Sequence, residues 1–160
     1  MKTFALTLLA GAASAVYTAN LPNNGFMKVH YDAASDRVVF DVTLQNNMWF
    51  AVGFGSSMVN TDIVAWSTYG VQSEQVDLYS RGNYFPGADR VNAYTTSIDV
   101  DAATGRVHFV SSRPMETGNA NDFTFALYEK FDIIYAFDKS SHIMNYHGAN
   151  RGYSSMTLTL

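Results

Sequence analysis

The sequence predicts an all-β protein, an antiparallel, immunoglobulin-like β-sandwich of about ten strands. Short runs rich in aromatic and β-branched residues recur along the chain at the regular spacing that is typical of a sandwich. Polar or glycine-containing connections separate several of these runs. After the predicted N-terminal leader described below, no segment has the apolar periodicity of an amphipathic helix.

The clearest strand covers residues 37–44. Val38, Phe40, Val42 and Leu44 fall on one face of this run, and mostly polar residues fall on the other, which indicates one face against a core and one toward solvent. Residues 80–92 predict a loop longer than a hairpin needs. In chain order, the predicted strands are residues 26–31, 37–44, 48–54, 62–67, 71–79, 91–100, 106–112, 122–131, 133–137, 141–146 and 153–160.

Residues 1–15 predict a secretory signal peptide. Lys2 precedes an apolar run at 4–12, and a small-x-small cleavage site follows at 13–15. Residues 16–160 then form a single domain of sufficient size for a hydrophobic core, which we expect to be secreted, extracellular and without a membrane span. Without Lys2, Lys and Arg fall from 10 to 9 against 14 acids, a net charge of about −5. This balance argues against nucleic acid and anionic membranes as partners.

The chain contains no cysteine. Disulfides, thiolate-ligated haem, covalently attached c-type haem, iron–sulfur clusters and thiol catalysis are therefore excluded. Any haem in this protein must be held without a covalent bond.

The stretch 48–66 organises the rest of the chain. Residues 48–54 are aromatic, apolar or small throughout, as in a strand that is covered on both faces. Gly53 and Gly55 leave side-chain volume missing near the end of that strand, where a ligand or another backbone can approach closely. Met58 follows on a Gly/Ser-rich loop rather than within an apolar run, a position that suits a soft ligand aimed at a metal.

This stretch resembles the signature segment of the DOMON domain, a β-sandwich module. The resemblance lies in Trp49, the Gly53-x-Gly55 turn, Met58 and the acidic-aliphatic run at 62–64. The segment 147–152, His-Gly-Ala-Asn-Arg-Gly, followed by a terminal strand, is similar to the haem-binding members, such as the b-type cytochrome domain of cellobiose dehydrogenase.

In those members a methionine and this histidine are the two axial ligands of a b-type haem. The resemblance therefore implies haem b, held without covalent attachment, with Met58 and His147 as the metal ligands. Trp49, Tyr84 and Phe85 could line the pocket, although aromatic residues in sandwiches are mostly core. Arg151 could pair with a haem propionate or, equally, with a neighbouring aspartate.

His142 is the alternative histidine ligand. His142 and His147 are separated by an odd number of positions, so on a continuous strand they would face opposite sides and would not share one ion. With both axial positions filled, the predicted centre transfers electrons and is not an enzyme, and it needs a separate redox partner protein. The alternatives are a haem-free DOMON module that binds a sugar or another small ligand, and a structural sandwich that contacts other proteins.

Overall fold

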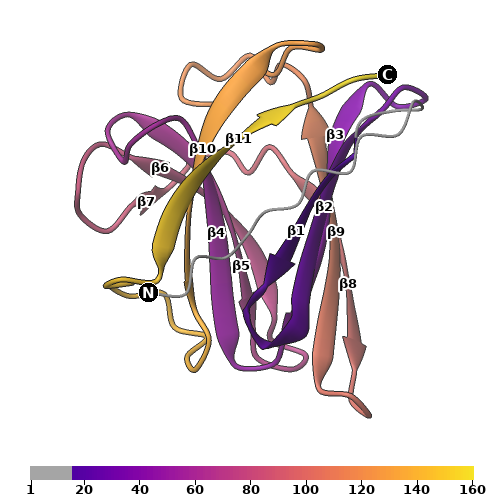
Figure 1. The fold of residues 1–160 in the computed structure, drawn as a ribbon, viewed down its shortest axis with the longest axis vertical. Coiled ribbons are helices and arrows are strands. Elements are labelled where there is room, and N and C mark those ends of the chain that lie inside the picture. The colour runs from indigo at the N-terminus through magenta and orange to yellow at the C-terminus, as the bar shows by residue number, and fades with distance from the viewer. Residues whose placement is uncertain (1–15) are drawn as a thin grey trace.

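The computed structural model describes residues 16–160, so the predicted signal peptide lies outside the described part. Two antiparallel sheets pack face to face as a β-sandwich, which confirms the predicted fold class (Figure 1). The first sheet has the order β1 (Tyr17–Leu21), β2 (Gly25–Asp32), β3 (Arg37–Gln45), β9 (Arg106–Pro114) and β8 (Thr95–Asp101). The second has the order β11 (Arg151–Thr157), β10 (Lys130–Asp138), β4 (Met48–Phe54), β5 (Thr61–Thr68), β6 (Glu74–Ser80) and β7 (Gly87–Ala88). One short 3-10 turn, η1 (Pro22–Asn24), joins β1 to β2.

The core lies between the two sheets and follows the predicted alternation. In β3, Val38, Phe40, Val42 and Leu44 are completely buried, while the residues between them are partly exposed. Trp66 of β5 is also completely buried, and its indole Nε1 donates a hydrogen bond of 3.0 Å to Ser111 Oγ of β9. This bond satisfies the one polar atom that Trp66 brings into the core.

Strand β4 is covered on both faces, as its sequence predicts. Met48, Phe50, Val52 and Phe54 belong to the main core, whereas Trp49, Ala51 and Gly53 face the other side. On that outer face of the six-stranded sheet, a second and smaller hydrophobic cluster lies over β5 and β6. Its members are Ile63, Ala65 and Leu78, with Ala51, Met58, Val76 and Met144 packed against them.

Two predicted strands are wrong. Residues 122–129 form an irregular connection because side chains, rather than a strand ladder, bind its backbone: Asp62 accepts the Phe123 N–H at 2.8 Å, and Arg113 donates to the Phe123 carbonyl. Residues 141–146 are also irregular, since Ser67 Oγ donates to the His142 carbonyl at 2.7 Å and no partner strand continues there.

Other boundaries differ from the prediction. Strand β1 was not predicted, although it pairs with β2 along its whole length; its polar Thr18 and Asn20 weaken the apolar signal. Strand β6 begins at Glu74 rather than at Val71, which is almost fully exposed, and β8 begins at Thr95 rather than at residue 91. The short β7 lies within the predicted loop 80–92.

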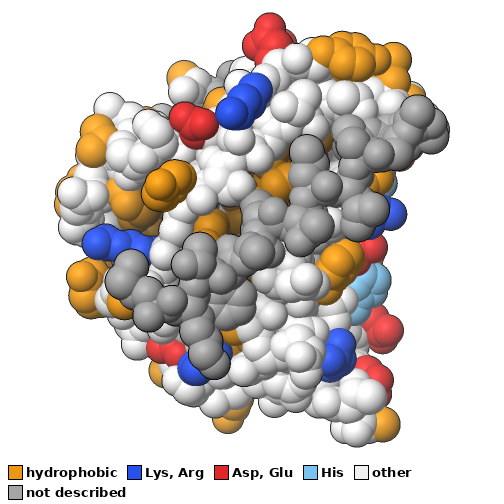
Figure 2. Space-filling view, viewed as in Figure 1, with side chains coloured by type: hydrophobic (Ala, Val, Ile, Leu, Met, Phe, Trp, Pro, Cys, Tyr) orange, Lys and Arg blue, Asp and Glu red, His pale blue; other side chains and the backbone are white. Residues whose placement is uncertain are grey.

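On the face shown in Figure 2, Lys, Arg, Asp and Glu side chains are scattered among uncharged atoms, without a continuous basic patch on that face. No helix within residues 16–160 is long and apolar enough to cross a membrane.

Candidate cofactor site

The candidate site is a hollow on the outer face of the six-stranded sheet, which we call the slot. It consists of two adjoining cavities of about 440 and 430 Å³. These volumes are in the usual range for small-molecule and cofactor sites. Both cavities share a set of seven lining residues: Ala51, Met58, Ile63, Asn83, Ala136, His147 and Arg151.

Small residues on β4 create the floor of the slot. Ala51 and Gly53 alternate with the core residues of β4 and therefore face outward. A Cβ atom on Gly53 would lie only 2.9 Å from Ile134 Cγ1 of the neighbouring strand, so a larger residue would have to push Ile134 aside. The volume that Gly53 leaves free is thus filled by Ile134 and Thr61, so at this position it is neighbouring side chains that approach the backbone.

Met58 reaches the slot from the connection between β4 and β5. Thr61 Oγ1 donates to the Ser57 carbonyl at 2.5 Å, and the Val59 N–H donates to Ser57 Oγ at 3.2 Å, so the turn around Met58 is held by its own side chains. The Met58 side chain is half-buried and packs against the Ile63 cluster of the sheet face. Met58 belongs to the lining of both cavities.

His147 reaches the slot from the opposite end of the sheet. Because β10 and β4 are antiparallel, with Asp138 opposite Trp49 and Ile133 opposite Phe54, the connection after β10 leaves at the end where β4 begins. His147 is part of that connection and lines both cavities, as Met58 does.

The ring of His147 is held in one tautomer. Its Nδ1 lies 3.1 Å from the Gly148 carbonyl oxygen, which can only accept, so Nδ1 must carry the proton. In the neutral imidazole the lone pair is then on Nε2, the form that binds a metal. Gly148 has φ +56°, a left-handed conformation that favours glycine and lets the backbone turn back against the ring.

The other predicted residues also line the slot. Trp49 is 3 % exposed, and its indole Nε1 is buried without a hydrogen-bond partner. Tyr84 and Phe85 form an exposed wall from the connection after β6. Arg151, the first residue of β11, is exposed at the mouth and makes no ion pair within residues 16–160, so the aspartate pairing that the sequence also allowed is not present there.

His142 lies elsewhere. Its ring stacks on Tyr69 with centroids 4.1 Å apart, and its Nδ1 lies 2.9 Å from Asn47 Oδ1. It lines neither cavity of the slot. His142 therefore anchors the start of the 139–150 connection at the ends of β4 and β5, while His147 lies further along the same connection.

Sequence reasoning missed several lining residues. Met144 packs beside Met58 on the same hydrophobic cluster, and Asn83 lines both cavities. Ile63 and Leu78 form part of the lining and belong to the hydrophobic cluster of the outer face. Nothing in the local sequence marks Met144, because residues 141–146 are irregular.

The slot offers neutral, soft donors. Its lining contains a thioether pair and an imidazole but no Asp or Glu side chain. Among the described residues there is no group of three or more His, Cys, Asp and Glu side chains that could hold a metal ion.

Comparison with solved structures shows the same fold in two fungal proteins. The chain is similar to the cytochrome domain of Myriococcum thermophilum cellobiose dehydrogenase, with a TM-score of 0.66 and 8 % identity over 90 % of this chain and 83 % of that one. It is also similar to the cytochrome b domain of pyranose dehydrogenase from Coprinopsis cinerea, with a TM-score of 0.62 and 13 % identity over 88 % and 80 % of the two chains. At these identities the likeness is one of fold.

No curated protein sequence matches the chain significantly. A family model does: the DOMON domain model matches residues 23–138, which include the strand and turn of the signature segment. The match covers well over half of the sequence, so the chain belongs to the DOMON domain family.

Proposed function

We propose that this protein is a secreted electron-transfer module that binds one haem b non-covalently, with Met58 and His147 as axial ligands. The observation that carries the proposal is that these two side chains, from connections at opposite ends of the sheet, line one slot. Secretion rests on the predicted signal peptide at residues 1–15.

The residues of the slot fit a haem. Met/His is an established axial pair for haem iron, and the Nδ1 bond to Gly148 leaves His147 Nε2 free for that role. Arg151, exposed at the mouth, is a donor for a haem propionate.

A bound haem would supply a one-electron carrier, and the chain's residues would set its properties. A methionine ligand would raise the reduction potential relative to two nitrogen ligands, and the hydrophobic cluster of the sheet face would place apolar side chains near the ring. Tyr84 and Phe85 would cover one edge of the ring. A haem held by both Met58 and His147 would have no iron position left for oxygen or substrate, so we infer electron transfer rather than catalysis.

Two dehydrogenase domains of the same fold support this function, because both are described as cytochrome domains. In this reading the redox partner is a separate protein.

The test is an absorption spectrum of the purified protein after addition of haem, first oxidised and then reduced with dithionite. We expect the sharp reduced bands of a six-coordinate, low-spin haem. Met58→Ala and His147→Ala should each convert the spectrum to a high-spin form and weaken haem binding, because each removes one axial ligand.

His142→Ala is the matched control, since His142 is on the same connection but stacks on Tyr69 outside the slot. It should leave the spectrum unchanged. A low-spin spectrum that survives in His147→Ala and disappears in His142→Ala would make the ligand assignment wrong. A protein that takes up no haem would reject the proposed function itself.

A further inference from the structure

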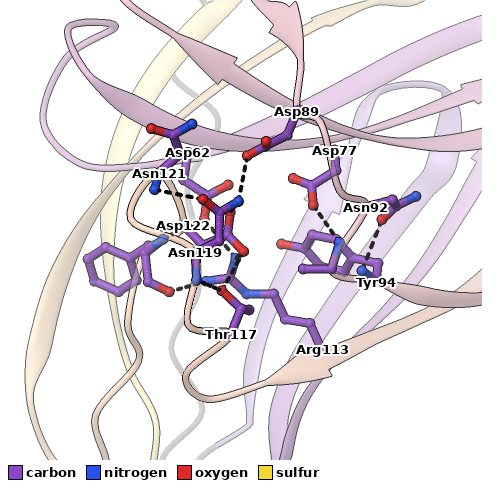
Figure 3. A network of polar contacts seen from close by, with 12 residues as sticks. Asp62, Asp77, Asp89, Asn92, Tyr94, Arg113, Thr117, Asn119, Asn121 and Asp122 are labelled. Carbon is purple, nitrogen blue, oxygen red and sulfur yellow. Dashed lines mark hydrogen bonds and ion pairs between the residues drawn. The ribbon is translucent and has the colours of Figure 1, made fainter.

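A buried polar network lies between the sheets, on the inner side of β5, β6 and β9 (Figure 3). At its centre is Arg113, which is completely buried. Its Nη1 lies 2.8 Å from Asp62 Oδ2 and 3.8 Å from Asp122 Oδ2, and its Nη2 donates to the Phe123 carbonyl. One guanidinium is therefore shared by two carboxylates that are themselves almost fully buried.

Asp77 of β6 is the third buried carboxyl of this network, and it has no cationic partner. It is 3 % exposed. Its Oδ2 accepts the Ala93 N–H at 2.8 Å, and its Oδ1 has no hydrogen-bond partner. Its main-chain carbonyl accepts the Asp89 N–H at 2.9 Å. Asp77 thus joins β6 to the connection that leads from β6 to β8, residues 81–94.

The groups around Asp77 do little to offset the negative charge of an ionised Asp77 carboxylate. Asp62 comes from β5, Arg113 from β9, Asp122 from the 115–129 connection, and Tyr94 and Asp89 from the 81–94 connection. Asp89 Oδ2 accepts a hydrogen bond of 3.1 Å from Asn119 Nδ2. The only cation in this set is Arg113, which Asp62 and Asp122 already engage.

The acidity of Asp77 reflects this environment. Burial raises the pKa of Asp77 to about 7, against the lowering effect of the Ala93 N–H; the charges of Asp62 and Asp122 raise it further and Arg113 lowers it. In the closed fold a proton would neutralise Asp77, because Arg113 is already paired with Asp62 and Asp122.

We propose that a proton on Asp77 holds the 81–94 connection against β6, and that loss of this proton releases the connection. A buried carboxylate with an unpaired oxygen needs water, and the connection is the element that can move to admit it. Its ladder to β6 is limited to β7, which pairs with Leu78 and Tyr79 only. Most of its residues are exposed.

The same connection contains Tyr84, Phe85 and Pro86, which form a wall of the slot. Release would therefore loosen the wall of the slot without changing Met58 or His147. This consequence for the slot does not depend on which ligand the slot takes.

The direction of the pH effect follows from the two states. In the released connection Asp77 would be hydrated, with a pKa near the ordinary value of 3.8, whereas in the closed fold its pKa is about 7. The closed state is then favoured most below pH 4. Its free-energy advantage over the released state falls as the pH rises from about 4 to 7 and changes little above pH 7.

The test is amide hydrogen exchange by NMR on the wild-type chain from pH 5 to pH 7.5, corrected for intrinsic exchange. The opening equilibrium at the Asp89 and Ala93 amides should rise by about tenfold or more between pH 5 and pH 7 and then level off. The Val42 amide, in the centre of the first sheet, should show no such rise.

Asp77→Asn should remove the pH dependence at Asp89 and Ala93, because an amide of the same shape keeps an acceptor for the Ala93 N–H and does not ionise. Asp99→Asn, on the exposed side of β8, is the matched control and should behave as the wild type. The proposal is overturned if Asp77→Asn retains the wild-type pH dependence. If this variant does not fold, an NMR titration of the Asp77 carboxyl carbon in the wild type replaces it. The proposal is overturned if the pKa of Asp77 is near its ordinary value of 3.8. It is also overturned if the protection of the Asp89 and Ala93 amides does not change over the pH range in which Asp77 titrates.

Discussion

Replacing Arg113 with methionine should lower the free energy of unfolding at pH 7 by about 3–5 kcal/mol, because it leaves buried carboxylates without their cation. Asp62 and Asp122 would both lose the guanidinium, and the Phe123 carbonyl would lose its donor. The guanidinium also lies over the ring of Phe125, 4.6 Å from its centroid. Urea denaturation followed by tryptophan fluorescence measures the loss.

Three comparisons make this result specific. Arg106→Met, at a half-buried position on the same strand, should change the stability by no more than about 0.5 kcal/mol. The double variant Asp62→Asn with Arg113→Met should lose less than the sum of the single losses, because the two groups compensate each other. A loss below about 1 kcal/mol for Arg113→Met would contradict the account of Arg113 as the neutralising cation.

The pH dependence of the stability loss in Arg113→Met is a further test. Burial already raises the pKa of Asp62, while Arg113 lowers it. Without Arg113 the pKa of Asp62 should rise further, so that Asp62 takes up a proton more readily in the folded state. The destabilisation of Arg113→Met should therefore be largest at neutral pH and should shrink as the pH falls.

The predictable part of this fold is the part governed by local patterning. The alternation in 37–44 identifies both the strand and its buried face, since Val38, Phe40, Val42 and Leu44 are all at 0 % exposure. The unbroken apolar run 48–54 correctly indicates a strand covered on both faces. These patterns succeed because burial in a sandwich is decided residue by residue along each strand.

The candidate site was partly predictable for a different reason. Met58, His147, Trp49, Tyr84, Phe85 and Arg151 line the slot together, and family resemblance, not periodicity, brought most of them to notice. Met144 was not found because it lies on an irregular segment whose path depends on contacts with Asn47, Ser67 and Tyr69. Such contacts join residues far apart in the sequence and leave no local pattern.

The inner network was missed for a related reason. Arg113 and Asp77 fall on inward positions of β9 and β6, where the alternation predicts apolar residues. Their burial is possible only because the 115–129 connection brings Asp122 and the Phe123 backbone to them. The aromatic residues of 122–131 predict a strand, because aromatic residues are common in strands. In the structure these residues fill the end of the sandwich instead.

Phe125→Ala tests that role and should lower the free energy of unfolding by about 3–5 kcal/mol. Phe125 is 4 % exposed, and its ring contacts those of Phe54 at 5.0 Å and Phe131 at 5.6 Å between centroids. Its removal would leave a cavity beside the Arg113 guanidinium and open a path for water to Asp62. Chemical denaturation gives the loss, and Tyr128→Ala, at a 63 % exposed position on the same connection, is the control and should be near neutral. If the two variants were equally stable, the 122–129 segment would be an ordinary surface loop, and its aromatic contacts would not explain why it departs from the strand that its sequence predicts.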